Sequence, residues 1–212
     1  MAPLDVVIDV SDAQGVIDWA AVANAGIKVA FVKATEDASF AARRWPMNKR
    51  EAEKAGLKVI GYHFIGRANF ERQAAHFRDV AGLTPGSAYA LDWEGHPTAT
   101  AEEVEMMGNA LLEITGRTPL GYWGIPGSSP ENPTPAMQRW ERWVPRYPLR
   151  NIANFQQLPE RRRSPGVPSY RFWQYTKWGL VPGIHGFVDR SIASFDDVEE
   201  LVRWCDQGPP TA

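Results

Sequence analysis

The chain has 212 residues, of which 23 are basic and 25 acidic, so its net charge is −2 at neutral pH; 44% of its residues are hydrophobic. These proportions are typical of a globular protein and exclude wholesale disorder. No apolar run approaches the roughly 20 residues that cross a bilayer, so we expect no membrane insertion. The small net charge argues against nucleic-acid binding driven by bulk charge.

The sequence offers few residues for metal or redox chemistry. Cys205 is the only cysteine, which excludes an intramolecular disulfide and a thiolate metal cage. None of the four histidines, His63, His76, His96 and His185, has the spacing of a known metal motif. Glycine-rich phosphate loops are absent as well. We therefore expect no metal and no cofactor.

Short apolar runs alternate with helical patterns along the first half of the chain. The expected strands lie at 6–10, 29–34, 58–65, 89–94, 120–123, 143–147, 172–176 and 187–189. The expected helices lie at 17–25, 45–55, 69–80, 101–115 and 195–204. Such alternation predicts βαβ units and a parallel sheet.

The second half is less regular, because proline-rich stretches at 124–135 and 148–169 are typical of loops. A complete (β/α)₈ barrel needs about 250 residues. The pattern therefore favours an α/β fold, a distorted TIM-like (β/α) barrel with helices reduced in its second half. An open doubly wound sheet is the alternative. We expect one domain over residues 1–212, with its core at about 5–205.

Acidic residues gather where strands are expected to end. Asp9 lies near the end of the first expected strand, Asp92 and Glu94 lie at the end of the fourth, and Asp189 lies at the end of the last. The carboxyl ends of barrel strands form the active site in this architecture. Four acids without metal ligands beside them favour a glycoside hydrolase.

The spacing of Asp92 and Glu94 has a physical meaning. Residues i and i+2 of a strand point to the same face, about 6.6 Å apart, so Trp93 points the other way. Two nearby carboxyl groups ionise with difficulty together, and one pKa rises. The group with the raised pKa can protonate a leaving oxygen while the other stabilises positive charge. Acids at strand ends also cap helices or pair with arginine, which is the alternative.

Aromatic residues and Gln174 lie on the same strands. Candidate sugar-binding residues are Tyr62, Phe64, Tyr122, Trp143, Tyr147 and Gln174. Aromatic rings stack on sugars, although such residues also fill barrel interiors. His63 points away from Tyr62 and Phe64, and a lone histidine in a strand is more often a hydrogen-bonded core residue than a catalyst.

These motifs, taken in order, resemble those of glycoside hydrolase family 25, the lysozymes that act as N-acetylmuramidases. The matching pieces are 9–15 (DVSDAQG) with 17–19 (IDW), 31–36 (FVKATE), 55–64 (AGLKVIGYHF), 73–77 (QAAHF), 91–94 (LDWE), 143–147 (WVPRY), 173–175 (WQY) and 188–189 (VD). The chain departs from the family at Asp37, at Pro145 and Arg146, and at Arg190 and Ser191, where other residues are common.

The resemblance implies hydrolysis of the β-1,4 bond between N-acetylmuramic acid and N-acetylglucosamine in bacterial peptidoglycan, with net retention. It implies Glu94 as general acid/base, Asp92 as the residue that orients the 2-acetamido group, and Asp9 and Asp189 as the rest of an acidic floor. Whether a protein carboxylate or the acetamido group attacks the sugar stays open. A wall-binding protein without activity and a hydrolase of another N-acetylated β-1,4 glycan are the alternatives.

The biological setting is a further expectation. The first residues of the chain do not read as a secretory signal peptide, and no separate wall-binding module is evident. This resembles a phage or prophage endolysin that accumulates in the cytoplasm before release, and we expect a monomer. A processed extracellular lysozyme is the alternative. Residues 139–171 hold eight arginines and two glutamates, a net charge of +6, and predict either an anion-binding patch or a solvated loop.

Overall fold

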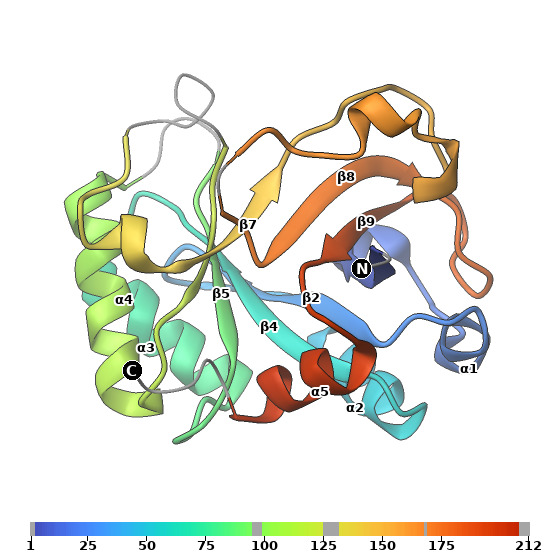
Figure 1. The fold of residues 1–212 in the computed structure, drawn as a ribbon. Helices are drawn as coiled ribbons and strands as arrows, with labels where there is room; N and C mark the ends of the chain where they lie inside the picture. The colour runs from blue at the N-terminus through green and yellow to red at the C-terminus, as the bar shows by residue number, and fades with distance from the viewer. Residues whose placement is uncertain (1–2, 95–98, 125–131, 168, 208–212) are drawn as a thin grey trace.

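A closed β-barrel forms the centre of the computed structural model, which describes residues 3–94, 99–124, 132–167 and 169–207 (Figure 1). Its eight strands are β1 (Leu4–Val10), β2 (Val29–Glu36), β4 (Lys58–Phe64), β5 (Tyr89–Asp92), β6 (Leu120–Tyr122), β7 (Glu141–Pro145), β8 (Phe172–Gly179) and β9 (Val188–Ala193). Strand β1 pairs with both β2 and β9, which closes the ring. A short strand, β3 (Phe40–Ala41), pairs with β2 outside the barrel. The barrel, and not the open sheet, is therefore the fold.

The last strand runs opposite to the direction that the sequence indicates. Strands β1 to β8 of the barrel pair in parallel, whereas β9 is antiparallel to both β8 and β1. The prediction that a strand ends at Asp189 is wrong, because β9 begins at Val188. Since β9 is reversed, its first residues lie at the same barrel mouth as the last residues of the parallel strands.

Five helices surround the sheet: α1 (Trp19–Asn24), α2 (Trp45–Lys54), α3 (Phe70–Ala81), α4 (Ala101–Thr115) and α5 (Val198–Gln207). The side chains of Asn69 and Thr100 cap α3 and α4, and the glycines Gly82 and Gly116 end them in the left-handed conformation. All five expected helices are present, with ends shifted by a few residues. None of the described helices is long and apolar enough to cross a membrane.

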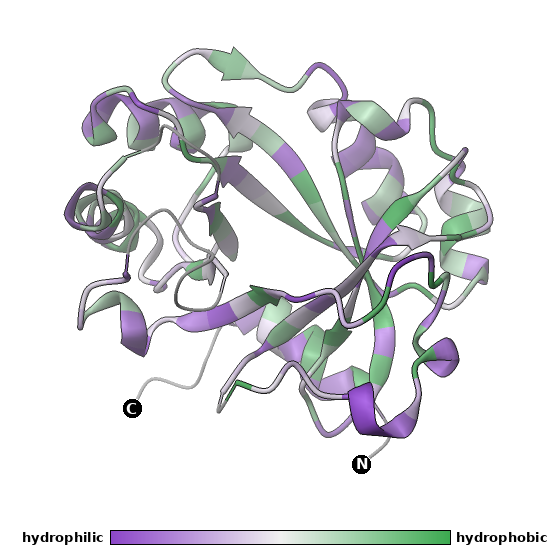
Figure 2. Ribbon diagram, turned by 90° about the horizontal axis from the view of Figure 1, so that it is seen from above, coloured by the Kyte–Doolittle hydropathy of each residue, from purple (hydrophilic) through white to green (hydrophobic). Residues whose placement is uncertain are grey.

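Two apolar layers follow from the alternation of side chains along the strands. Inward residues such as Phe31, Trp143 and Phe172 fill the barrel, while outward residues pack under α1 to α4. Helix α5 closes the end of the barrel opposite the mouth, where Leu201 and Trp204 join the inner layer. The hydropathy colours of Figure 2 show mixed faces on the helices, as this packing requires.

Between β7 and β8 an irregular segment takes the place of a helix, as expected for the second half. Two short 3₁₀ turns, η3 (Phe155–Gln157) and η4 (Glu160–Arg162), are its only regular elements among the residues described there. Ile152, Phe155 and Leu158 bury the outer face of β8 and β9. In Figure 1 this segment arches over β8.

Several arginines of the basic segment hold this irregular backbone in place. Arg163 donates from Nε to the carbonyl oxygen of Leu158 at 2.8 Å and from Nη2 to that of Gln156 at 3.2 Å. Arg162 donates to the carbonyl oxygen of Pro148. These bonds satisfy carbonyl groups that a helix would pair internally. All three arginines are exposed, but Arg161 makes no hydrogen bond or ion pair with a described residue.

Candidate active site

Four acids meet at the barrel mouth. Asp9 lies near the end of β1, Asp92 ends β5, and Asp189 lies at the beginning of β9. Asp9 and Asp92 are 7% and 6% exposed, Asp189 is half-buried and Glu94 is exposed. The charges act on one another, since Asp189 and Asp92 raise the pKa of Asp9, and Glu94 raises that of Asp92. The structure thus brings together all four acids that the sequence points to.

Strand β5 is shorter than expected, because its ladder ends at Asp92 and not at Glu94. The Trp93 amide still donates to the carbonyl oxygen of Tyr122 at 2.8 Å. The Trp93 side chain is fully buried in the helix layer, and its indole donates to the carbonyl oxygen of Ala99 at 3.0 Å. This anchor fixes the backbone between the two acids, with Trp93 on the face away from the mouth.

Gln174 links two of the acids to two tyrosines. Its Nε2 donates to Asp9 Oδ2 at 2.9 Å and to Asp189 Oδ2 at 3.2 Å. Its Oε1 accepts from the hydroxyl of Tyr122 at 2.8 Å and from that of Tyr147. Gln174 is 2% exposed, so this network forms a rigid, buried floor.

Burial is the main cause that raises the pKa of both Asp9 and Asp189. Burial first, and then the charge of Asp189, raise the pKa of Asp9 well above its usual range. Burial raises the pKa of Asp189 to about 6, although a hydrogen bond with Asp9 lowers it. Burial therefore favours the protonated form of both carboxyl groups, and most strongly that of Asp9.

The second pair consists of Asp92 and Glu94. Burial and the charge of Glu94 raise the pKa of Asp92 well above its usual range, and Asp92 Oδ1 is buried without a hydrogen-bond partner among the residues described. Partial burial raises the pKa of Glu94, while Lys33 and Lys177 oppose that rise. Glu94 is the most exposed of the four acids, so it can exchange a proton with a substrate.

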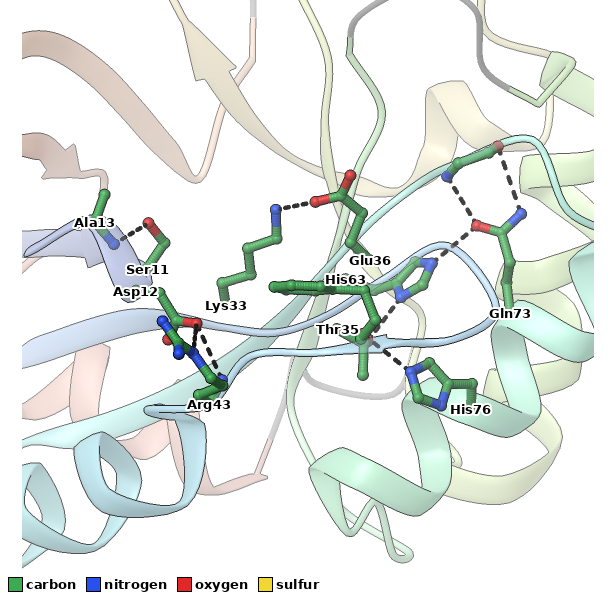
Figure 3. Close-up of polar contacts among 12 residues, drawn as sticks. Ser11, Asp12, Ala13, Lys33, Thr35, Glu36, Arg43, His63, Gln73 and His76 are labelled. Carbon is green, nitrogen blue, oxygen red and sulfur yellow. Dashed lines mark hydrogen bonds and ion pairs between the residues drawn. The ribbon is translucent and has the colours of Figure 1, made fainter. Parts of the chain in front are cut away.

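Two lysines at the mouth are not among the residues predicted from the sequence. Lys33 Nζ lies 2.6 Å from Glu36 Oε2 (Figure 3) and 4.5 Å from the ring centroid of Phe64. Lys33 follows Val29 and Phe31 on the inward face of β2. A charged residue in this row of apolar residues is the signal from which its place at the mouth could have been predicted. Lys177 lies near the end of β8, one residue beyond the strand that the sequence predicts.

The predicted aromatic residues divide into two groups. Tyr62, Tyr122 and Trp143 are at most 8% exposed and lie inside the barrel, where the Trp143 indole donates to Ser191 Oγ at 3.1 Å. They form the floor beneath the acids. Tyr147 is 39% exposed, and Phe64 is half-buried beneath Lys33, so these two reach the surface. The strand predicted at 143–147 lies two residues earlier, at Glu141–Pro145, which leaves Tyr147 on the following loop.

His63 is a core residue outside the acid cluster. It is fully buried, with Nδ1 2.7 Å from Thr35 Oγ1 and Nε2 3.0 Å from Gln73 Oε1 (Figure 3). Burial lowers its pKa to about 4, so the ring is neutral at pH 7. His96, which does not have the spacing of a metal motif, lies outside the described residues.

Comparisons with known proteins agree with this geometry. Residues 8–184 match the sequence profile of glycosyl hydrolases family 25. Lysozyme M1 of Streptomyces globisporus is 26% identical over 87% of this chain and 66% of its own, and the autolytic lysozyme of Clostridium acetobutylicum is 32% identical over 86% and 53%. The uncharacterized protein YegX of Escherichia coli K12 is 30% identical over 94% and 72%. The chain thus spans between half and three quarters of these relatives.

Solved structures show the same fold. The bacterial lysozyme from Streptomyces coelicolor superposes with a TM-score of 0.73 at 24% identity, covering 95% of this chain and 97% of that one. The muramidase from Acremonium alcalophilum gives a TM-score of 0.75 at 22% identity, over 97% and 99%. With an acid cluster at the mouth of this barrel and a sequence match over most of its length, the chain belongs to glycosyl hydrolases family 25 and is a glycoside hydrolase.

Proposed function

We propose that the protein hydrolyses the β-1,4 bond between N-acetylmuramic acid and N-acetylglucosamine in peptidoglycan, with Glu94 as general acid/base and net retention. The observation that carries this proposal is the pair of Asp92 and Glu94. One carboxyl group is buried and the other exposed, at one mouth of the barrel, and each has a raised pKa. The lysozyme and muramidase names of the relatives supply the substrate class.

In this mechanism Glu94 donates its proton to the leaving glycosidic oxygen. The positive charge that develops on the sugar is stabilised by the ionised carboxylates at the mouth. Glu94, now ionised, then removes a proton from the water that attacks the intermediate. Partial burial keeps Glu94 protonated to a higher pH than a free side chain, which favours its first step.

We assign to Asp92 the role of acceptor for the N–H group of the 2-acetamido substituent. Its Oδ1 is buried and has no hydrogen-bond partner among the described residues, so it has a free acceptor site. A buried carboxyl with a raised pKa is a poor nucleophile, because the attacking form is the ionised one. The acetamido oxygen of the substrate is therefore the nucleophile in this proposal.

The decisive test is mass spectrometry of purified peptidoglycan after digestion with the wild-type protein and with Glu94→Gln. Fragments with N-acetylmuramic acid at the reducing end, formed by the wild type alone, support the proposal. Reducing-end N-acetylglucosamine would contradict the assigned bond. Pelleting with the wall without any fragments would support a binding protein instead.

The endolysin-like role expected from the sequence also stays a proposal. Cytoplasmic expression in a bacterial host, followed by permeabilisation of the inner membrane, should then cause lysis. Lysis without permeabilisation would contradict cytoplasmic accumulation.

A further inference from the structure

Lys177 reaches the barrel mouth because β8 is irregular there. Gln174 pairs with Ser191 and Thr176 with Arg190, so β8 contains one extra residue between the two pairs, a β-bulge. The Thr176 hydroxyl points outward and donates to the carbonyl oxygen of Ile152 at 2.7 Å. Lys177 is the next residue of the strand and is exposed. Its charge lowers the pKa of Glu94 and of Asp189. The bulge therefore directs a lysine toward the acids.

The two lysines at the mouth differ in their pairing. Lys33 is neutralised by Glu36, with 2.6 Å between Nζ and Oε2. Lys177 makes no ion pair within 4.0 Å and no hydrogen bond through Nζ with any residue that the structure describes. It is thus a cation without a carboxylate partner, beside four acids whose combined charge would repel an anionic substrate.

An aromatic pair positions this cation. The ring centroids of Tyr147 and Trp178 are 6.4 Å apart, and Lys177 Nζ lies 6.0 Å from the first and 5.5 Å from the second. The Tyr147 hydroxyl is bonded to Gln174, so the platform is fixed relative to the acid floor. Tyr147 is 39% exposed and Trp178 is half-buried, which leaves ring surface for a sugar.

We propose that Lys177, Tyr147 and Trp178 form a subsite in which Lys177 binds a carboxylate carried on the 3-O-lactyl arm of the glycan, while a sugar ring stacks on Tyr147, the more exposed of two rings that stand nearly perpendicular to each other. The inference rests on the proposed function and adds a specificity-determining residue to it. A plain N-acetylglucosamine polymer has no carboxylate, whereas muramic acid has one, either free on the lactyl group or on the attached peptide. An unpaired cation next to a stacking platform distinguishes these two glycans by charge.

The test compares Lys177→Met, Lys177→Arg and the control Lys49→Met on three substrates. Lys49 lies on α2 and is paired with Glu53 at 2.6 Å, so its substitution makes the same charge change far from the mouth. The substrates are soluble peptide-bearing peptidoglycan strands, strands whose peptides an amidase has removed, and neutral chitooligosaccharides. Binding to these three is also measured in the Glu94→Gln background, which does not depend on turnover.

Lys177→Met should raise KM, and Kd in the Glu94→Gln background, by about two- to five-fold at low salt on the carboxylate-bearing strands. It should change neither constant for chitooligosaccharides, and Lys177→Arg should restore the wild-type values. The increase should shrink in high salt. A larger effect on peptide-free strands identifies the lactyl carboxylate as the ligand, and a larger effect on peptide-bearing strands identifies the peptide.

An equal loss on neutral and carboxylate-bearing glycans, or no loss on either, would overturn this subsite. If the wild type cleaved no peptidoglycan, the proposed function would fail. The Kd comparison would still decide the role of Lys177 in that case, so the two failures can be told apart.

Discussion

Asp9 and Asp189 lie directly opposite each other on the antiparallel strands β1 and β9, and one amide group, that of Gln174, donates to both. Three strands thus meet in a single carboxyl–amide cluster. This arrangement exists only because β9 is reversed, since a parallel strand would place its first residues at the opposite end of the barrel. It holds two carboxyl groups close together in a buried site, where the protonated form of one is favoured.

The first prediction concerns the pH dependence of stability at Asp189. Its pKa is about 6 in the folded protein and near 3.8 when unfolded, so the folded state binds more protons between these values. Stability from this group is present below the unfolded pKa and is lost as pH rises through 6. We therefore compare the free energy of unfolding of Asp189→Asn with that of the wild type at each pH. The difference in favour of the variant should be larger at pH 7.5 than at pH 4.5, by at most about 3 kcal/mol.

Urea unfolding of both proteins at the two pH values measures this difference. Contributions from His63, which change in the opposite direction with pH, cancel between the two proteins. A constant difference in the free energy of unfolding across this range would show that Asp189 titrates normally.

The acids could be predicted from the sequence because strand periodicity and barrel geometry both apply to them. Asp9 follows the inward residue Val7, and Asp92 follows the inward residue Ala90, so each carboxyl group points into the mouth. Closure of the ring then brings together residues that are far apart in the chain. Neither step needs more than local pattern and the fold class.

The direction of β9 and the position of Lys177 could not be predicted in this way. A strand has the same residue pattern in both directions, and only the short connection from β8 to β9 favours an antiparallel pair. The bulge in β8 changes which side chains face inward beyond Gln174, and no single residue there signals it. Trp143 was predicted as a groove residue because periodicity shows the face of a side chain but not its depth inside the barrel.

The second prediction concerns His63 as a structural residue. Replacing it with Leu removes the partner of the Thr35 hydroxyl and one of the two partners of Gln73 Oε1, which also accepts from the Gly66 amide. Both side chains are buried, so the change should cost about 2–4 kcal/mol of unfolding free energy. The matched control is His76→Leu, because His76 is more exposed and, among the described residues, hydrogen-bonds only to the carbonyl oxygen of Phe40. Urea denaturation at pH 7 measures both, and similar small losses would contradict the structural role.

The pH dependence of the same variant has a definite sign. Because the pKa of His63 is lowered to about 4, the unfolded state binds more protons between pH 4 and 6.5. Wild-type stability from this group is present above pH 6.5 and is lost as pH falls toward 4. The penalty of His63→Leu should therefore become smaller at pH 4.5 than at pH 7.5. A penalty that stays constant would show that His63 ionises freely in the folded protein.

The third prediction separates the arginines of the basic segment. Arg161 and Arg163 are both exposed, but Arg163 donates to two backbone carbonyl groups and lies 5.6 Å from the ring centroid of Phe155, whereas Arg161 makes no hydrogen bond with a described residue. Arg163→Ser should cost about 1–3 kcal/mol of unfolding free energy, and Arg161→Ser should cost less than about 0.5 kcal/mol. Thermal melting of the two variants measures this. Equal melting temperatures would mean that the irregular segment does not depend on Arg163.

The fourth prediction is that Glu94→Gln lowers kcat on peptidoglycan by about 10²- to 10⁴-fold, because the amide cannot donate and then recover a proton. Glu94 is exposed and no described hydrogen bond depends on it, so the melting temperature should stay near that of the wild type. Asp92→Asn is the comparison variant. It should also reduce kcat, and unlike Glu94→Gln it replaces a buried carboxyl group, since Asp92 is 6% exposed.

The pH profile of the wild type gives the same prediction a second readout. Partial burial raises the pKa of Glu94, and Lys177 lowers it, so kcat/KM should fall as pH rises through that pKa. Lys177→Met should move this basic limb to higher pH on every substrate, neutral glycans included, because the lysine charge acts on Glu94 itself. Lys49→Met should leave the limb in place. If Lys177→Met left the basic limb of the pH profile in place, the proton transfer would belong to another group. The same conclusion would follow if the Glu94→Gln protein melted normally and retained near-wild-type kcat.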